Sequence, residues 1–473
     1  MMDHPTRIDL IRNIERALRD ESLQRQMGKA MPASRRARAD AAAELPEWES
    51  LRSTAAGIKD HVLANLEKYL RQLESQVSAL GGTVHWASDA AEARAIITDL
   101  ARSRGVRRIV KSKSMTTEEI FLNPALEAAG ASVVETDLGE YVVQLAGERP
   151  SHLIAPVVHK PTEEIADLFV KKLGVPRYER PEELARVARE VLRAEFLAAE
   201  MGITGVNFAI AESGTLVIVE NEGNARLTTT RPRIHMAVMG VEKVLPHLAD
   251  LSVFLRILAR SGTGQRSSVY VSLLTGPRRA GETDGPEELH LIILDNGRRR
   301  LLADPDLRGA LRCIRCGACQ NECPVYQHAG GHAYGSVYAG PIGAVLTPAY
   351  EGLERARDLP FASTLCRACA DVCPVKIDLP GMLVELRARA VRTGLVSWRD
   401  RMLLGAWTFF TGSPARFMLA GSLGRLAQRL VARGGKIERL PYPLSGWTAH
   451  RAAPVLASTP FRTWWKSRQG EGR

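Results

Sequence analysis

Two cysteine runs beyond residue 300 have the residue types and the spacing of iron–sulfur ligands. The first run, "CIRCGACQNECP", follows the complete CxxCxxCxxxCP pattern, with Cys313, Cys316, Cys319 and Cys323 followed by Pro324. The second run, "STLCRACADVCP", keeps Cys366, Cys369, Cys373 and Pro374, but Ser363 stands where its first cysteine is expected. Thiolates at this spacing converge on the irons of one cluster, and in two-cluster proteins the fourth cysteine of each run binds the other cluster.

That exchange divides the seven cysteines of the chain between two iron–sulfur clusters. A complete [4Fe-4S] cluster is expected on Cys313, Cys316, Cys319 and Cys373. The second cluster has Cys323, Cys366 and Cys369. We therefore expect it to be either [3Fe-4S] or [4Fe-4S], with serine, water or substrate on the last iron of the larger form. Ser363 is equally well explained as a loop serine or a helix cap.

Zinc is the rival metal, because two CxxC pairs can supply four thiolates in a tetrahedron. Two interleaved triplets, each followed by xxxCP, are much more specific to clusters than a CxxC pair is to zinc. The chemistry indicated is the transfer of single electrons, with potentials set by hydrogen bonds, charge and burial.

The rest of the composition is that of a soluble globular protein. The chain has 473 residues, of which 45% are hydrophobic and 25% charged, and this length allows two or three domains. All the cysteines lie between Cys313 and Cys373, whereas a secreted disulfide framework would spread them through the fold. The N-terminal stretch has no apolar signal segment, and the apolar run Met402–Phe410 is too short to cross a bilayer. We therefore expect a cytoplasmic protein without a transmembrane segment.

The positive charge is concentrated at the C-terminal end. Residues 398–473 contain thirteen Lys or Arg and three Asp or Glu, which gives +10 of the chain's net +11. No standard nucleic-acid-binding motif accompanies these residues, so we expect no nucleic-acid partner. A solvated basic surface is one interpretation, and a docking site for a partner or peripheral contact with an anionic membrane face is the other.

Short apolar runs alternate with helical segments in the first half of the chain. Strands are expected at residues 83–87, 107–112 and 132–136, with helices near 89–103 and 116–129 between them. Strands separated by helices imply crossovers and a mainly parallel sheet, so the fold class is α/β. Further helices are expected near 162–173 and 181–201, followed by a strand pair around Ser213 and Gly214 and by strands at "HMAVMG", "SVYVSLL" and "LHLIILD".

Changes in composition divide the chain into four segments. Residues 1–48 are expected to be a polar helical arm, an appendage in which Pro32 breaks a charged run. Residues 49–300 form the α/β domain, which begins with an amphipathic helix over residues 55–80. Residues 301–395 are expected to be a small all-α ferredoxin-like module, and residues 396–473 a basic tail that wraps an earlier domain or a partner.

Polar side chains gather where the predicted strands end, which is where open α/β sheets bind ligands. The stretch "KSKSMTTEE" joins a strand to a helix start, and its lysines and free N–H groups suit an anion such as a carboxylate or phosphate. An ordinary helix cap with surface lysines explains this stretch equally well, and turn chemistry alone would select the nearby glycines. The candidate residues for a small carboxylate substrate are Lys111, Lys113, Ser114, His159, Glu222 and Asn224.

The motifs "IKDHVLANLEKYL", "KSKSMTTEEIFLN", "GITGVNFAIAESG", "NEGNARL", "CIRCGACQNECPVYQHAGGHAYGSVYAGPIGAVL" and "LCRACADVCPVKIDLP" follow one another along nearly the whole chain. In this order they resemble the lactate utilisation protein B family, the iron–sulfur subunits of the lactate utilisation system. The resemblance implies an α/β domain similar to the sugar-phosphate isomerase and coenzyme A transferase fold, joined to a two-cluster module. It also implies that Ser363 is a family feature.

The same resemblance implies an electron carrier in the oxidation of L-lactate to pyruvate. Its companions would be a cysteine-rich iron–sulfur subunit and a second protein with the same α/β domain. An alternative is a transferase or isomerase that uses Glu220 or Glu222 as nucleophile or base, with the clusters in a structural or redox-sensing role. No flavin or nicotinamide fingerprint is seen, so hydride chemistry would take place on another subunit or at an unrecognised site.

Overall fold

The computed structural model describes residues 7–441, 444–449 and 451–470. The described chain up to Thr393 forms one compact unit, and the chain from Gly394 onward forms a second. The α/β part and the cysteine-bearing part therefore belong to the same unit, where side chains of both pack in one hydrophobic cluster.

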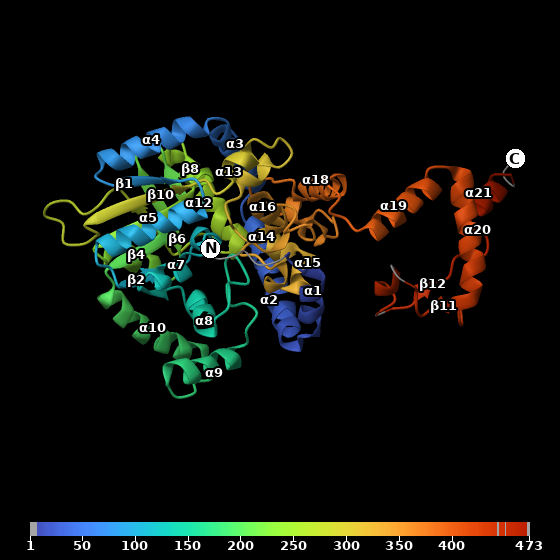
Figure 1. Ribbon diagram of the computed structural model, residues 1–473, viewed down its shortest axis with the longest axis horizontal. Helices are drawn as coiled ribbons and strands as arrows, with labels where there is room; N and C mark the ends of the chain where they lie inside the picture. Colours follow the sequence, from blue (N-terminus) through green and yellow to red (C-terminus); the bar gives the residue numbers. More distant parts are fainter. Residues whose placement is uncertain (1–6, 442–443, 450, 471–473) are drawn as a thin grey trace. The chain divides into compact units, whose positions relative to one another are not determined.

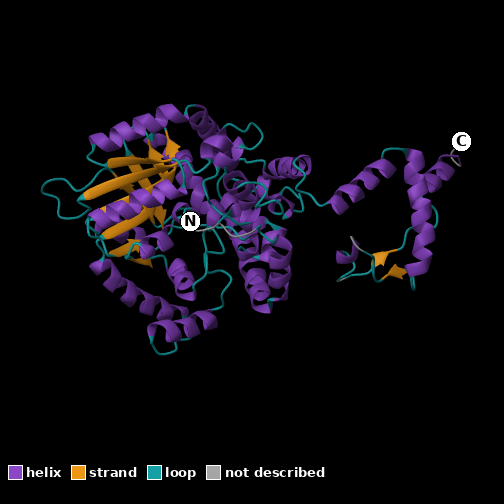
Figure 2. Ribbon diagram, in the orientation of Figure 1, coloured by secondary structure: helices purple, strands orange, loops and turns teal. Residues whose placement is uncertain are grey.

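The first unit is built on a six-stranded sheet in which every neighbouring pair is parallel (Figures 1 and 2). In spatial order the strands are β1 (Thr83–Ala87), β10 (Glu288–Leu294), β7 (Ile234–Gly240), β4 (Met201–Gly205), β2 (Arg108–Lys111) and β3 (Ser132–Glu135). The chain runs outward from β2 to β3 and then returns through β4, β7 and β10 towards β1. Open parallel sheets bind ligands at such a reversal, beyond the carboxyl ends of the strands.

Alternate residues of each strand point to opposite faces of the sheet, and helices cover both faces. In β7, Met236 and Val238 share a cluster with α5 (Ala90–Ser103) and α7 (Leu122–Ala128). Ala237 and Met239 share another cluster with α4 (Leu66–Ala79). A further cluster joins β2 to α8 (Leu138–Ala146), α9 (Thr162–Leu173) and α10 (Pro181–Ala198).

A second, four-stranded sheet contains the predicted strand pair around Ser213 and Gly214. Its spatial order is β8 (Val244–Leu245), β5 (Phe208–Ile210), β6 (Thr215–Glu220) and β9 (Tyr270–Leu274), and β5 and β6 are antiparallel. The rings of Phe208 and of Phe254 in α12 (Leu248–Gly262) lie 5.1 Å apart between centroids. Helix α11 (Asn224–Thr230) connects β6 to β7.

Three elements of the α/β part differ from the sequence prediction. Strand β4 begins at Met201, within the range expected for a helix. The helix expected over residues 116–129 is two helices, α6 (Met115–Glu119) and α7, because Phe121 adopts a left-handed conformation with φ 52°. The helix expected over residues 55–80 is divided at Asn65 into α3 (Trp48–Ala64) and α4.

The N-terminal arm is helical but packs as part of the first unit and not as an appendage. Helices α1 (Leu10–Arg19) and α2 (Glu21–Ala43) bury Leu10, Met27 and Met31 in the hydrophobic cluster that contains the cysteines. Pro32 lies inside α2 without ending it. Because proline has no backbone N–H, the carbonyl of Gly28 has no helical hydrogen-bond donor. Gly28 is exposed, so water can hydrogen-bond to this carbonyl.

The cysteine-bearing part consists of short helices. They are α14 (Ala318–Glu322), α15 (Pro324–Ala329), α16 (Gly340–Glu351), α17 (Ala368–Asp371) and α18 (Leu379–Arg392). Between residues 301 and 393, all of which the structure describes, there is no strand. The all-α character expected for this module agrees with these elements.

The second unit contains α19 (Trp398–Thr411), α20 (Pro414–Val431), α21 (Phe461–Gly470) and the short pair β11 (Lys436–Ile437) and β12 (Ala453–Pro454). Neither α19 nor α20 has a buried residue. In the part of the chain that the structure describes, no helix is long and apolar enough to span a membrane.

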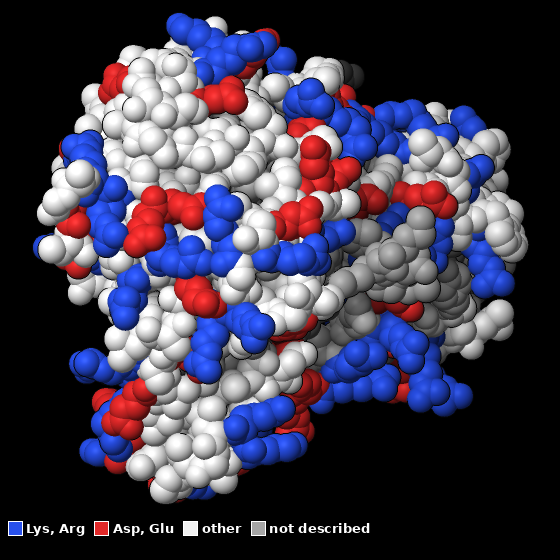
Figure 3. All heavy atoms as spheres, turned by 60° about the vertical axis from the view of Figure 1, so that its left-hand side comes forward, with Lys and Arg blue, Asp and Glu red and all other residues white. Residues whose placement is uncertain are grey.

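On the face seen in Figure 3, basic and acidic residues are interspersed, so this face has no extended field of one sign.

Candidate functional site

A cavity of about 550 Å³ lies beyond the carboxyl ends of the parallel strands. Its wall includes Ser112–Ser114 after β2, Asp137–Gly139 after β3, Gly205–Asn207 after β4 and Lys243 after β7. Other parts of the wall come from residues 153–157, from the end of α12, and from Ile314 and Arg315 of the first cysteine run. The cavity is therefore shared by the α/β sheet and the cysteine module.

Four of the six predicted substrate residues line this cavity, namely Lys113, Ser114, Glu222 and Asn224. The Lys113 ammonium donates a hydrogen bond to the carbonyl of Ile154, which ties the β2–α6 loop to the wall segment of residues 153–157. Ser114 caps α6 by accepting a bond from the Thr117 N–H at 3.3 Å. A Cβ on Gly205 would lie 2.7 Å from Ser114 Oγ, so glycine is required where β4 passes this cap.

Lys111 does not line the cavity, because it is enclosed by carboxylates. Its Nζ lies 2.9 Å from Glu118 Oε1 and 2.7 Å from Glu135 Oε1, and the side chain is fully buried. Burial alone would lower the pKa of Lys111, but Glu118, Glu135 and Glu140 outweigh burial and raise it. Burial also raises the pKa of Glu140 well above its usual value. The charge of Lys111 is thus compensated within the protein.

His159 also lies outside the cavity wall and joins two parts of the chain. Its Nε2 lies 2.8 Å from Glu148 Oε2, and its Nδ1 lies 2.9 Å from Ser151 Oγ. The His159 ring packs edge-on against His332 of the cysteine module, with 4.6 Å between the centroids. Both ring nitrogens therefore have partners within the segment after α8, and the ring contact with His332 holds this segment against the cysteine module.

The two glutamates considered as nucleophile or base differ in their contacts. The carboxylate of Glu220 accepts bonds from the N–H groups of Ala225 at 2.7 Å and Arg226 at 2.8 Å, so it holds the first turn of α11. Glu222 accepts one bond, from the Leu138 N–H at 3.2 Å. Burial raises the pKa of Glu222. Glu222 is thus the less engaged of the two carboxylates in the cavity wall.

Lys243 is a cavity residue that the sequence did not single out. It ends the 3-10 turn Val241–Lys243 directly after β7, and only 7% of it is exposed. It lines the cavity, and it makes no hydrogen bond or ion pair with any residue that the structure describes. Burial and the nearby Arg315 together lower the pKa of Lys243 to about 8, although Glu242 and Cys313 act in the opposite direction. The only sequence signal for Lys243 is its position just past a strand end.

A network of buried charges lies next to Lys243. Arg298 contacts Glu242 Oε2 at 2.7 Å and Glu119 Oε2 at 2.8 Å, and Arg315 reaches Glu242 Oε1 at 3.5 Å. The ammonium of Lys59 donates to the backbone carbonyl of Glu242. Burial alone would raise the pKa of Glu242, but the two arginines outweigh it and hold the pKa at about 2. The network connects β7 to the first cysteine run.

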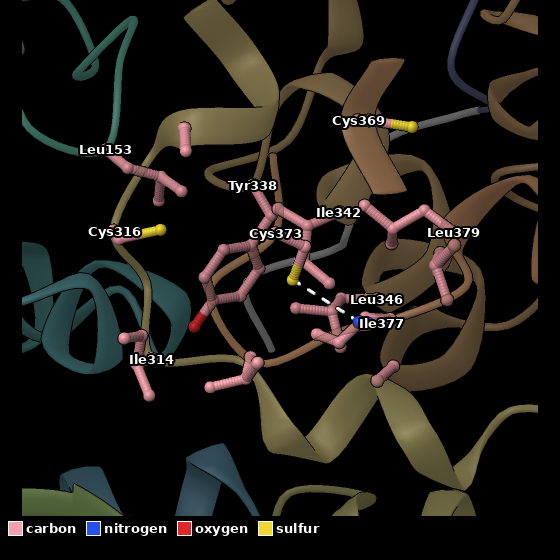
Figure 4. Close-up of a cluster of buried hydrophobic side chains, with 14 of the residues drawn as sticks. Leu153, Ile314, Cys316, Tyr338, Ile342, Leu346, Cys369, Cys373, Ile377 and Leu379 are labelled. Carbon is pink, nitrogen blue, oxygen red and sulfur yellow. Dashed lines mark hydrogen bonds between the residues drawn. The ribbon is translucent and has the colours of Figure 1, made fainter. Parts of the chain in front are cut away.

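Four cysteines line a separate, small cavity in the cysteine module, and we call them the inner set: Cys313, Cys316, Cys319 and Cys373. In Figure 4 the sulfurs of Cys316 and Cys373 point into the same region, whereas Cys369 lies apart from them. The Arg315 N–H donates to Cys313 Sγ at 3.4 Å, and the Ile377 N–H donates to Cys373 Sγ at 3.4 Å. The sulfurs are thus gathered and hydrogen-bonded as cluster ligands are.

The turn that carries the first three inner cysteines depends on Gly317. This residue has φ 77°, and a Cβ on it would lie 3.1 Å from Ile154 Cγ1 and 3.2 Å from His152 Cε1. Glycine therefore allows both the left-handed turn and the close approach of the α/β wall segment. Leu153 and Ile314 line both the α/β cavity and the cavity of the inner set.

The remaining cysteines form the outer set, which consists of Cys323, Cys366 and Cys369. Cys323 and Cys369 are buried, whereas Cys366 is exposed. Burial and the neighbouring Cys323 and Cys366 together raise the pKa of Cys369 to about 12. Ser363 Oγ accepts a bond from the Leu365 N–H at 3.1 Å. The serine oxygen thus already has a partner in its own loop.

The residues around the cysteines fit iron–sulfur clusters. All seven candidate ligands are thiols, which suit iron and sulfide, and none is paired in a disulfide. Tyr334 is fully buried, and its hydroxyl lies beside the Cys323 thiol, with no other hydrogen-bond partner among the described residues. Burial raises the pKa of Tyr334 well above its usual value, and the thiols of Cys323 and Cys319 contribute to the rise. A cluster sulfide beside Cys323 would give this hydroxyl an acceptor.

Comparisons with known proteins assign both parts of the first unit. A model of the LUD domain matches residues 70–294, and a model of the 4Fe-4S dicluster domain matches residues 309–377. The parallel-sheet α/β prediction and the iron–sulfur prediction are confirmed. The crystal structure of a DUF162 family protein from Deinococcus radiodurans is 14% identical, with a TM-score of 0.28, and the match covers 48% of this chain and 98% of that one.

Several proteins named lactate utilization protein B are similar over almost the whole chain. The protein from Shouchella clausii is 44% identical over 98% of this chain and 97% of its own. The protein from Bacillus licheniformis is 45% identical over 96% of this chain and 95% of its own. The protein from Geobacillus thermodenitrificans is 47% identical over 91% of this chain and 90% of its own. These similarities extend through both matched domains and into the basic tail.

Proposed function

Because this chain belongs to the lactate utilization protein B family, we propose that it is the iron–sulfur electron-transfer subunit of a multi-protein system that oxidises L-lactate to pyruvate. The oxidation releases two electrons and two protons, and the electrons leave through this subunit to a further acceptor. The companions are a cysteine-rich iron–sulfur subunit and a second protein with the lactate-utilisation domain. The system works in the cytoplasm, with peripheral contact at the inner membrane face as one arrangement of the basic tail.

The observation that carries the proposal is the wall common to the two cavities. Leu153 and Ile314 line the α/β cavity on one side and the inner cysteine set on the other. A small carboxylate in the α/β cavity would therefore lie against the loop that carries Cys313 and Cys316. Such proximity favours electron transfer between the two sites and has no evident use in a purely structural cluster.

The inner set would hold a [4Fe-4S] cluster, and the outer set a [4Fe-4S] or [3Fe-4S] cluster. When bound, these clusters accept and donate single electrons. The protein's own part is to fix the thiolates and to donate the N–H groups of Arg315 and Ile377 to sulfur, which stabilises the more negative state. The exposed Cys366 puts the outer set closest to solvent, where an acceptor can approach.

The polar wall of the α/β cavity would bind the substrate. Lys113, Ser114, Glu222 and Asn224 belong to this wall and come from the loops after β2 and β6. Lys111 supports them indirectly, since its ion pairs with Glu118 and Glu135 link the β2, β3 and α6 elements.

The test is anaerobic reconstitution of the full chain, followed by L-lactate with and without the companion proteins, while EPR follows cluster reduction. We expect L-lactate to reduce the clusters in the complete assembly. Pyruvate is the matched control, because it lacks the carbinol hydrogen and cannot donate these electrons. If the complete assembly shows no lactate-dependent reduction, the proposed function is wrong.

A further inference from the structure

One end of the α/β cavity lies beside more positive charge than the neighbouring carboxylates balance. Four cations gather there: Lys59, Lys243 and Arg298 are buried, and the side chain of Arg315 is 10% exposed. The carboxylates among them are those of Glu119 and Glu242, and Arg298 contacts both. Buried charges without partners are costly, so this end is suited to an additional anion.

Lys243 is the member of this group with the most freedom to bind a ligand. The Lys59 ammonium is committed to the carbonyl of Glu242, and Arg298 is committed to two carboxylates. Lys243 has no such partner among the residues described, yet it is almost completely buried and lines the cavity. A lysine is rarely buried in this way unless something pairs with it.

Arg315 brings a second cation to the same end from the cysteine module. It stands between Cys313 and Cys316 and adopts a left-handed backbone conformation with φ 61°, which is uncommon for a residue with a side chain. Its guanidinium stacks 4.7 Å from the ring centroid of Tyr338, and its contact with Glu242 is long, at 3.5 Å. Donors of Arg315 therefore remain available to the cavity that it lines.

We propose that Lys243 and Arg315 together form the carboxylate-binding end of the cavity and hold the substrate acid against the first cysteine run. This inference rests on the proposed function for the substrate class, which is a short 2-hydroxy or 2-oxo carboxylate. The lysine would supply a point charge and the arginine a planar pair of donors, a combination that fixes the orientation of a carboxylate.

Anchoring of the substrate carboxylate at this end determines where the rest of the substrate lies. Ile314 lies next to Arg315 in the chain and forms part of the wall shared with the inner cysteine set. The carbon attached to the anchored carboxylate would therefore lie at the Ile314 side of the cavity. A three-carbon acid fills only a small part of the 550 Å³, so longer 2-hydroxy acids are expected to bind as well, with the same anchor.

A rival explanation is that these cations only balance the negative charge of the cluster thiolates. The two explanations predict different results for Lys243, because this residue lines the α/β cavity and does not line the cavity of the inner set. If Lys243 serves the cluster alone, its removal changes the reduction potential of the inner cluster and leaves the affinity for acids intact.

The experiment is calorimetric titration of the anaerobically reconstituted full chain with L-lactate and with pyruvate. Lys243→Met should weaken binding of both acids by about tenfold to a hundredfold, because it removes a charge-assisted hydrogen bond, whereas Lys243→Arg should retain most of the affinity. Lys171→Met, on the exposed side of α9, is the matched control and should bind as the unaltered chain does. Iron content and potentiometric EPR are measured on each variant.

Arg315→Gln is the second test. Arg315 lies between the proposed cluster ligands Cys313 and Cys316, so the affinity of this variant is interpreted together with its iron content. Unchanged affinity in Lys243→Met, with or without a shifted potential, would overturn the inference. Failure of the unaltered chain to bind either acid would also overturn it. The proposed function is judged separately, by lactate-dependent reduction in the complete assembly.

Discussion

The inner and outer cysteine sets contain the same ligand chemistry in two different environments. The inner set is enclosed between the α/β cavity and the helical module, and it shares Leu153 and Ile314 with that cavity. The outer set has one exposed thiol, Cys366, and only three cysteines. For the proposed electron transfer, this difference predicts a direction, in which electrons enter near the cavity and leave near the surface.

The largest expected effect comes from removing one ligand of each set in turn. Cys319→Ala should abolish lactate-dependent reduction of both clusters in the complete assembly, because the inner cluster is the entry point. Cys366→Ala should leave the inner cluster reducible by L-lactate but stop delivery to the acceptor. EPR under single-turnover conditions distinguishes the two outcomes.

The control for this pair is reduction by dithionite, which bypasses the substrate cavity. Each variant should still show the signal of its remaining cluster with this reductant. The opposite direction of electron flow is indicated if Cys366→Ala blocks cluster reduction by L-lactate while Cys319→Ala permits it.

The iron–sulfur module was predictable because the spacing of its cysteines is local. CxxC turns place sulfurs side by side whatever the surrounding fold, and "CIRCGACQNECP" contains the Gly317 that the turn needs. The parallel sheet was also predictable, since its strands are separated by clear helical segments. Strand β4 was missed because "MGITG" is short, contains two glycines and directly follows a helix.

The cavity residues were only partly predictable, and two lysines illustrate the reason. Lys111 and Lys243 both lie at or just past the end of a parallel strand. Lys111 is neutralised by Glu118 and Glu135, which come from different elements, whereas Lys243 has no ion-pair partner among the residues that the structure describes. A local pattern cannot distinguish these two cases, because the partners are brought together only by the tertiary fold.

A smaller effect is expected from two arginines that hold the two ends of the second cysteine run. Arg52 donates to the carbonyls of Cys373 at 2.9 and 3.0 Å and of Asp371 at 2.8 Å, beside the inner set. Arg387 donates to the carbonyls of Pro360 at 2.9 Å and Ser363 at 3.0 Å, at the start of the outer loop. Each side chain thus fixes the backbone at one end of this run.

Arg52→Met and Arg387→Met form a matched pair, since each change removes hydrogen bonds to backbone carbonyls. Losing these hydrogen bonds should destabilise the backbone at each end of the run by about 1 kcal/mol and speed iron release to a chelator by about fivefold. Arg52→Met should affect the inner cluster and Arg387→Met the outer one, as followed by the EPR signal of each cluster. Equal acceleration of both clusters by either variant would show that the two sets do not open independently.

The smallest effect is expected at Ser363, and it decides what the outer set is. The serine oxygen accepts the Leu365 N–H at 3.1 Å, and its backbone carbonyl accepts the Arg387 guanidinium at 3.0 Å. A side chain held in its own loop in this way is expected to cap the turn and not to bind iron. Ser363→Ala should therefore leave the iron content per chain unchanged, and loss of one iron would identify the hydroxyl as a ligand. Ser363→Cys then separates the two cluster types, because added iron means that the native cluster has three irons. Unchanged iron with an altered EPR signal means that the native fourth iron is open, which would make the outer set reactive as well as exposed.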